Sequence, residues 1–202
     1  YEIASCLVGS EMCIRDREKS FWYVKAPAFS FAKLNGMDAY LSPEMKSTGE
    51  AIGYDRKFPR AMYKALIASG VKMQNYGTVM VTLADEDKEE ALPLIRRFYE
   101  MGFNIEATVG TGEFLKAHGI RTRIRRKLSE NSTEILEAIR SGYVSYVINT
   151  RAILSGVHYE DGLAIRRTAI ENNVTMFTSL DTVKVLLDVL EEITIGVSPL
   201  YA

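Results

Sequence analysis

Short apolar runs alternate with helical segments from Tyr76 to near the end of the chain. The expected strands are residues 78–83, 104–108, 121–128, 143–149 and 174–178, and the expected helices are 88–101, 112–118, 132–141, 163–172 and 181–193. Gly102, Gly119 and Gly142 follow three of these helices, where a left-handed residue is favoured. Strict alternation of strand and helix predicts an α/β fold, a Rossmann-like parallel sheet of about five strands with helices on both faces.

The chain has a different character before Tyr76. Residues 21–31 are aromatic and extended, and Pro27 confines them to an edge strand or a connector. Residues 41–55 are turn-rich, without a period of their own, and read as the trailing edge of a larger unit. An amphipathic helix is expected over 58–69 and ends at Gly70. We therefore divide the chain into a remnant (21–55), a linker helix (56–75) and a domain (76–202).

Residues 1–20 fit neither helical nor strand periodicity. The stretch SCLVGSEMCIRDR resembles a translated library-adapter sequence. We expect a non-native leader here, with a genuine leader as the alternative, and exclude it from functional reasoning.

Composition narrows the class of function. The chain has 25 basic and 26 acidic residues, which argues against a general nucleic-acid surface. Cys6 and Cys13 lie in the leader with no histidine nearby, so neither a metal site nor a disulfide framework is expected. No apolar run approaches the roughly 20 residues of a membrane span. These features predict a cytoplasmic protein that binds neither nucleic acid nor membrane.

Ligands of open parallel sheets bind outside the carboxyl ends of the strands. The second expected strand is followed by Thr108-Val-Gly-Thr-Gly112, where hydroxyls and amides open into a helix whose N-terminus favours an anion. An ordinary glycine turn is the alternative, because this is neither a dinucleotide nor a Walker motif. After the first strand, Lys88 stands at a helix N-terminus, where a cation is disfavoured unless an anion is near.

Polar residues also close the remaining strands. Five basic residues crowd the third strand, Arg121, Arg123, Arg125, Arg126 and Lys127. Lys127 is closest to the carboxyl end and is the candidate ligand, whereas a solvated basic edge explains most of the arginines. The fourth strand ends in 149–151 (NTR), and the fifth ends in 178–179 (TS) before a helix capped by residue 181. Together these strand ends predict a phosphate site.

Catalytic chemistry is not evident. His118 is expected near the end of a short helix and His158 in the loop GVHYEDG, both at the surface. No carboxylate pair is obviously aimed into the pocket, although Asp85 and Asp161 stay open as candidates. We expect ligand binding rather than catalysis, with no catalytic or metal-binding residues.

Three segments carry a family resemblance: ATVGTGEFL, KLSENSTEILEAIRSGYVSYVINT and AIRRTAIENNVTMFTSLDTVKVLL. They resemble the methylglyoxal-synthase-like domain that ends the large subunit of carbamoyl-phosphate synthase. VKAPAFSFAKL and LSPEMKSTGEAIG resemble the segment that joins the second ATP-grasp half to that domain. The resemblance implies that 21–55 is an ATP-grasp remnant and that the ATP-grasp catalytic residues lie outside this chain.

The resemblance also implies a role. The whole enzyme, a ligase with ATP and Mg or Mn, makes carbamoyl phosphate from bicarbonate, glutamine-derived ammonia and two ATP for pyrimidine and arginine biosynthesis. Its partners are the rest of the large subunit and the glutaminase small subunit, and its C-terminal domain binds UMP or IMP as allosteric effector. No cofactor is expected in this fragment.

The implied phosphate-binding residues are Lys88, Thr108, Thr111, Lys127 and Asn149, with Thr82 and Thr150 as neighbours and Arg151 and Thr178 as possible additions. Arg151 replaces a threonine of the family's better-known version. Ala26 replaces a glutamate that helps to hold ornithine in some members, which fits a UMP-inhibited enzyme better than an ornithine-activated one.

Two alternatives remain at this stage. A stand-alone methylglyoxal synthase acting on dihydroxyacetone phosphate would use the same fold and phosphate site, but it needs a carboxylate general base. An interaction module would instead use the basic strand to contact a partner subunit.

Overall fold

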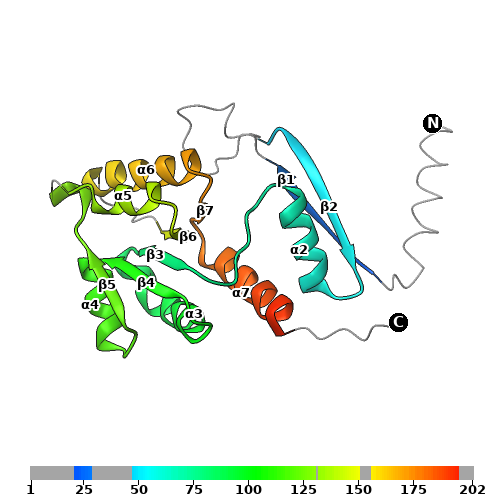
Figure 1. Ribbon diagram of the computed structural model, residues 1–202, viewed down its shortest axis with the longest axis horizontal. Helices are drawn as coiled ribbons and strands as arrows, with labels where there is room; N and C mark the ends of the chain where they lie inside the picture. The colour runs from blue at the N-terminus through cyan, green and yellow to red at the C-terminus, as the bar shows by residue number, and fades with distance from the viewer. Residues whose placement is uncertain (1–20, 29–46, 131, 151–155, 196–202) are drawn as a thin grey trace.

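A five-stranded parallel sheet organises the larger part of the molecule, a computed structural model that describes residues 21–28, 47–130, 132–150 and 156–195 (Figure 1). The strands are β3 (Thr78–Thr82), β4 (Asn104–Thr108), β5 (Thr122–Arg125), β6 (Val144–Asn149) and β7 (Thr175–Phe177). Their spatial order is β5-β4-β3-β6-β7, so the first strand of the sheet in sequence lies at its centre. The predicted α/β class with a parallel sheet is confirmed.

Helices cover both faces of this sheet. One face carries α3 (Lys88–Glu100), α4 (Val109–Ala117) and α7 (Leu180–Ile195), and the other carries α5 (Glu134–Arg140) and α6 (Gly156–Glu171). All five residues of β3 are buried, as expected for a central strand covered on both sides. Gly102, Gly119 and Gly142 have φ of +91°, +79° and +80°, which confirms their predicted role at helix ends.

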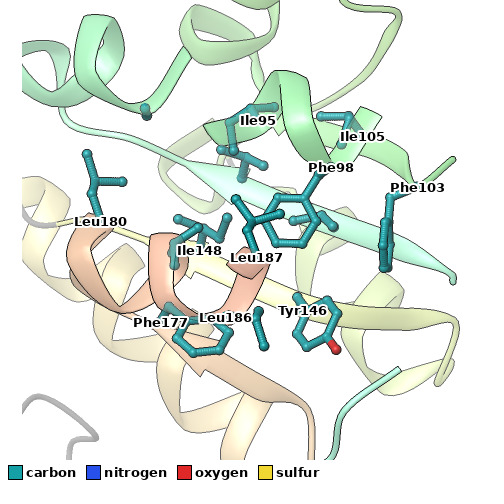
Figure 2. Close-up of a cluster of buried hydrophobic side chains, with 14 of the residues drawn as sticks. Ile95, Phe98, Phe103, Ile105, Tyr146, Ile148, Phe177, Leu180, Leu186 and Leu187 are labelled. Carbon is teal, nitrogen blue, oxygen red and sulfur yellow. The ribbon is translucent and has the colours of Figure 1, made fainter. Parts of the chain in front are cut away.

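The larger core lies between the sheet and the helices α3, α4 and α7 (Figure 2). Phe98 of α3, Tyr146 of β6 and Leu187 of α7 are fully buried there. A smaller core under α5 and α6 includes Met80 and Val147, which point to the opposite face from their strand neighbours.

A separate hairpin precedes the sheet domain. Strand β1 (Trp22–Ala28) pairs antiparallel with β2 (Gly49–Asp55), and α2 (Phe58–Ala68) packs on one face of the pair. Residues 41–55 were expected to lack regular structure, and β2 corrects this for 49–55. The inward positions of β2 are the small residues Ala51 and Gly53, so the strand has no apolar period to detect.

Three other expectations need correction at element ends. Helix α4 begins at Val109 rather than at 112, and α6 begins at Gly156 rather than at 163, which puts His158 in a helix and not in a loop. The strand expected over 121–128 ends at Arg125, and a 3-10 turn, Leu128–Glu130, follows. Polar and glycine residues in the first turns of α4 and α6 conceal these helix starts.

No helix in the described part of the chain has both the length and the apolar character needed to cross a bilayer. The predicted leader, 1–20, lies outside the described residues, and the division into remnant, linker and domain stays a prediction.

Candidate functional site

A pocket opens at the carboxyl ends of β3, β4 and β6, with α6 as one wall. Seven of the predicted site residues line it: Thr82, Lys88, Thr108, Thr111, Lys127, Asn149 and Thr150. They come from four separate segments of the chain, which the parallel sheet brings to one edge because all its strands end on the same side.

Hydrogen bonds connect the ends of β3 and β6 at the floor of the pocket. The Asn149 side-chain amide donates to Thr82 Oγ1 at 2.7 Å, and both side chains are buried. The Thr150 amide donates to the Thr82 carbonyl at 3.1 Å, and the Ala84 amide donates to Thr150 Oγ1 at 2.9 Å. The hydroxyl and amide groups are therefore held in fixed positions.

Helix α4 starts at the pocket, directly after β4. Thr108 takes the N-cap position without a side-chain cap bond, and the free N–H groups of the first turn follow it. Thr111, almost fully buried, accepts a hydrogen bond from the Leu83 amide at 3.3 Å. The predicted glycine loop is thus the first turn of a helix, and a helix N-terminus favours an anion.

Lys88 provides a cation on the other side of this turn. Its Nζ donates to the Gly110 carbonyl at 3.1 Å and lies 2.6 Å from Asp85 Oδ1. The Lys88 side chain is 17% exposed and that of Asp85 is 95% exposed. A pair with such an exposed carboxylate is weak, so the lysine can exchange this partner for a ligand anion.

The basic segment after β4 contains both pocket-lining and exposed side chains, and this agrees in part with the prediction. Lys127 lines the pocket, while the side chains of Arg123 and Arg126 are 69% and 70% exposed. Arg125 departs from a solvated edge because its side chain is 15% exposed and bonded to Glu106 at 2.8 Å. Hydrogen bonding to Glu106 raises the pKa of the Arg125 guanidinium. Arg125 therefore has a structural partner of its own.

The sequence model of the MGS-like domain family matches residues 90–178. The chain therefore contains an MGS-like domain. The match covers most of the pocket-forming segments, whereas Thr82 and Lys88 precede its first residue.

The solved structures that are similar to the chain include a methylglyoxal synthase and ForH. Methylglyoxal synthase from Elizabethkingia anophelis NUHP1 aligns with 16% identity over 57% of this chain and 79% of that chain, with a TM-score of 0.47. ForH aligns with 18% identity over 58% of this chain and 80% of that chain, with a TM-score of 0.46. Similarity at this level says nothing about a shared ligand.

The pocket of the MGS-like domain has an apolar wall that the sequence analysis did not identify. Leu128, Ile135 and Ile165 line it beside the polar end. Nothing distinguishes these residues from other core positions in the sequence, because Ile135 and Ile165 follow the ordinary helical period of α5 and α6.

Arg166 of α6 was also missed. It is 2% exposed, lines the pocket and donates to Asn149 Oδ1 at 3.0 Å. The spacing gives a weak indication that Arg166 is buried, because Gly162, Arg166 and Ala169 share one face of the helix and all three are buried.

Two carboxylates, Asp85 and Asp161, are among the described residues that line the pocket. Asp161 Oδ2 accepts a hydrogen bond from the Ser129 amide at 3.1 Å, which ties α6 to the turn after Lys127. The structure therefore brings to the pocket both of the carboxylates that stayed open as candidates in the sequence.

The other predicted residues have different positions. Thr178 follows β7, is half-buried and is not among the residues lining the pocket. Arg151 lies outside the described residues. His118 caps the end of α4 with its ring exposed, and Nδ1 lies 2.8 Å from the Phe114 carbonyl oxygen. Over the described ranges, no three histidine, cysteine or acidic residues are close enough together to hold a metal.

Proposed function

We propose that the pocket binds the phosphate of a nucleoside monophosphate, UMP or IMP, and that the domain is the allosteric effector-binding domain of a carbamoyl-phosphate synthase large subunit. The observation that carries the proposal is the convergence of Lys88, Lys127 and the N-terminus of α4 on one pocket. Lysine charges, hydroxyls and free helix N–H groups are the donors that phosphate requires.

The apolar wall supports an organic phosphate rather than inorganic phosphate. Leu128, Ile135 and Ile165 offer a surface on which a base can pack, next to the polar end. Asp161 supplies a carboxylate that can accept hydrogen bonds from ribose hydroxyls. A nucleotide carries a matching group for each: a phosphate, a ribose and a base.

The rest of the parent enzyme belongs to the same proposal. The upstream segments VKAPAFSFAKL and LSPEMKSTGEAIG support an ATP-grasp body before this domain. That body would bind ATP with Mg or Mn, and the glutaminase small subunit would supply ammonia, all in the cytoplasm. Carbamoyl phosphate made there would enter pyrimidine and arginine biosynthesis.

A thermal or denaturant titration of the whole chain tests the binding claim. UMP or IMP at ~100 times its dissociation constant should add about 2.7 kcal/mol to the free energy of unfolding. Lys127→Ala should weaken nucleotide binding about ten- to a hundred-fold, because a charge-assisted hydrogen bond is lost. Arg121→Ala, on the exposed part of the same basic segment, is the matched control and should leave affinity unchanged.

Equal losses in the two variants would place the phosphate elsewhere. If UMP, IMP and inorganic phosphate all fail to stabilise the chain at millimolar concentration, the binding function is wrong, and an interaction module becomes the better description.

The position of Asp161 favours one second function, a methylglyoxal synthase acting on dihydroxyacetone phosphate. The carboxylate lines the phosphate pocket, where proton abstraction from a bound triose phosphate requires a base. Methylglyoxal formation by the wild-type chain, lost in Asp161→Asn, would establish this reaction. No methylglyoxal above the rate of a no-enzyme control would exclude it.

A further inference from the structure

A buried arginine forms part of the wall of the candidate pocket. Arg166 lies on α6 and is 2% exposed, while its sequence neighbour Arg167 is exposed. A guanidinium stays protonated at any physiological pH, and taking it out of water is costly unless its donors are satisfied. Its position beside the pocket therefore points to a specific task.

The described polar contact of Arg166 leads into the floor of the pocket. Its Nη1 donates to Asn149 Oδ1 at 3.0 Å, and Asn149 Nδ2 donates to Thr82 Oγ1 at 2.7 Å. The Thr82 hydroxyl in turn donates to the Ile148 carbonyl at 3.3 Å. Three side chains and one carbonyl thus form a chain in which every donor points the same way.

The arginine sets the direction of this chain. An asparagine amide can be turned by 180° with little change in shape, and its two orientations differ only in which end accepts. Arginine has donors and no acceptor, so the amide atom that faces it must be oxygen. The Asn149 nitrogen is then directed at Thr82, and the Thr82 hydroxyl proton is committed to the carbonyl of Ile148.

A glycine makes the approach of the guanidinium feasible. A Cβ on Gly162 would lie 2.9 Å from Arg166 Nη1 and 3.4 Å from Asn149 Oδ1. The first distance is too short for a real contact, so an alanine would displace the end of the arginine side chain. Gly162 therefore offers a way to disturb the contact while all polar groups are kept.

We propose that Arg166 is a positioning residue of the pocket, which fixes the Asn149 amide so that one N–H of Nδ2 is held by Thr82 and the other is available to a bound phosphate. This rests on the proposed function, because it assigns Asn149 to the phosphate end. Arg166 acts through Asn149 and contributes by geometry more than by charge.

Isothermal titration of the whole chain with UMP and with inorganic phosphate tests the inference. Arg166→Met should weaken binding about ten- to a hundred-fold, the range for losing a hydrogen bond to a charged group. Arg166→Gln, which keeps an N–H donor without the charge, should recover a large part of this loss. The matched control is Arg167→Met, on the exposed side of the same helix, which should bind as wild type.

Full rescue by Arg166→Lys with none by Arg166→Gln would overturn the inference, because charge alone would then explain the effect. A double-mutant cycle gives a second readout that loss of packing would not produce. In an Asn149→Ala background, Arg166→Met should add less than about a two-fold further loss, since residues in one network are not additive. Additive losses would mean that Arg166 does not act through Asn149.

One further experiment needs no ligand, so it tests the role of Arg166 separately from the proposed nucleotide binding. In a ¹⁵N-edited spectrum, the Asn149 side-chain NH₂ signals, assigned by their loss in Asn149→Ala, should be protected from solvent exchange in the wild type. Arg166→Met and Gly162→Ala should each remove this protection. If Arg166→Met does not fold, Gly162→Ala alone serves as the test. If the protection persists in Gly162→Ala and Arg166→Met, the positioning role is wrong. If the wild type shows the protection but binds neither nucleotide nor phosphate, only the proposed function is wrong.

Discussion

The sheet domain and the hairpin before it bury their surfaces in different ways. All five residues of β3 are buried, whereas β2 buries only Ala51 and Gly53. Helices cover both faces of the five-stranded sheet, but α2 covers one face of the hairpin. The other face leaves Tyr23, Ile52 and Tyr54 exposed at 60%, 65% and 58%.

This difference separates a sheet with both faces covered from a hairpin with one face covered. The parallel sheet supplies its own cover, so its stability follows from its own sequence. The outer face of the hairpin carries a stacked pair of exposed tyrosines, Tyr23 and Tyr54, and exposed apolar side chains can mark interaction sites. In the proposed parent enzyme, this face would pack against the remainder of the large subunit.

Polar contacts join the two regions. Lys57 and Arg60 of the hairpin side contact Glu192 of α7 at 2.9 and 3.3 Å. Tyr146 donates to the Gln74 carbonyl at 2.7 Å and accepts from the Gln74 amide, which fastens the linker to the core. These bonds add to the packing of α2 against α7 and can be removed separately.

The largest contrast is expected from one truncation in each region. Leu187→Ala, at a fully buried position of α7, should lower the free energy of unfolding by about 2–5 kcal/mol. Ile52→Ala, on the outer face of the hairpin, should change it by less than about 0.5 kcal/mol. Denaturant unfolding of both variants measures the difference, and comparable losses would show that the outer face is covered in solution.

The second contrast is pH dependence at the junction. Burial raises the pKa of the Tyr146 hydroxyl from 10.0 to about 12. The unfolded chain loses this proton first, so the stabilisation is complete below pH 10 and is lost as the pH rises towards 12. The loss should reach about 2–3 kcal/mol.

Denaturant midpoints across this alkaline range measure the effect. Tyr146→Phe is the control and should flatten the dependence, at a small cost in stability for the lost bonds to Gln74. The same alkaline slope in both proteins would assign the effect to other groups.

The smallest and most local change is expected from Gly53→Ala. An added Cβ would clash with the Ala61 carbonyl oxygen and the backbone of Ala65 in α2. Such overpacking costs about 1–3 kcal/mol, and here it should loosen the hairpin without unfolding the sheet. Limited proteolysis should then cut residues 47–58 faster, while the main thermal transition stays within a few degrees. A large drop of the main transition would mean that the two regions unfold as one unit.

The same comparison explains what the sequence could predict. β6 was predicted to within one residue, 143–149 against Val144–Asn149, because it is an apolar run that buries large side chains such as Tyr146 and Ile148. β2 was not predicted, because its buried positions hold alanine and glycine, which leave no apolar alternation. Periodicity detects strands that bury large side chains and misses strands that bury small ones.

The pocket could be predicted from the sequence for a related reason. The carboxyl ends of parallel strands share one edge, so Thr82, Thr108 and Asn149 could be grouped before any geometry was known. Arg166 could not be separated from Arg167, since the two are chemically identical neighbours and only the rotation of α6 decides which is buried. That rotation is a result of tertiary packing.

The bond between Asn149 and Thr82 has a consequence for the order of folding. Its partners are 67 residues apart, and β4 and β5 lie between them in the chain. We expect a contact between residues so far apart to form late in folding, because closing the long loop between them costs conformational entropy. The pocket therefore comes into existence only when the two halves of the sheet have joined. A ligand held there should slow the unfolding of the chain and leave its folding rate almost unchanged.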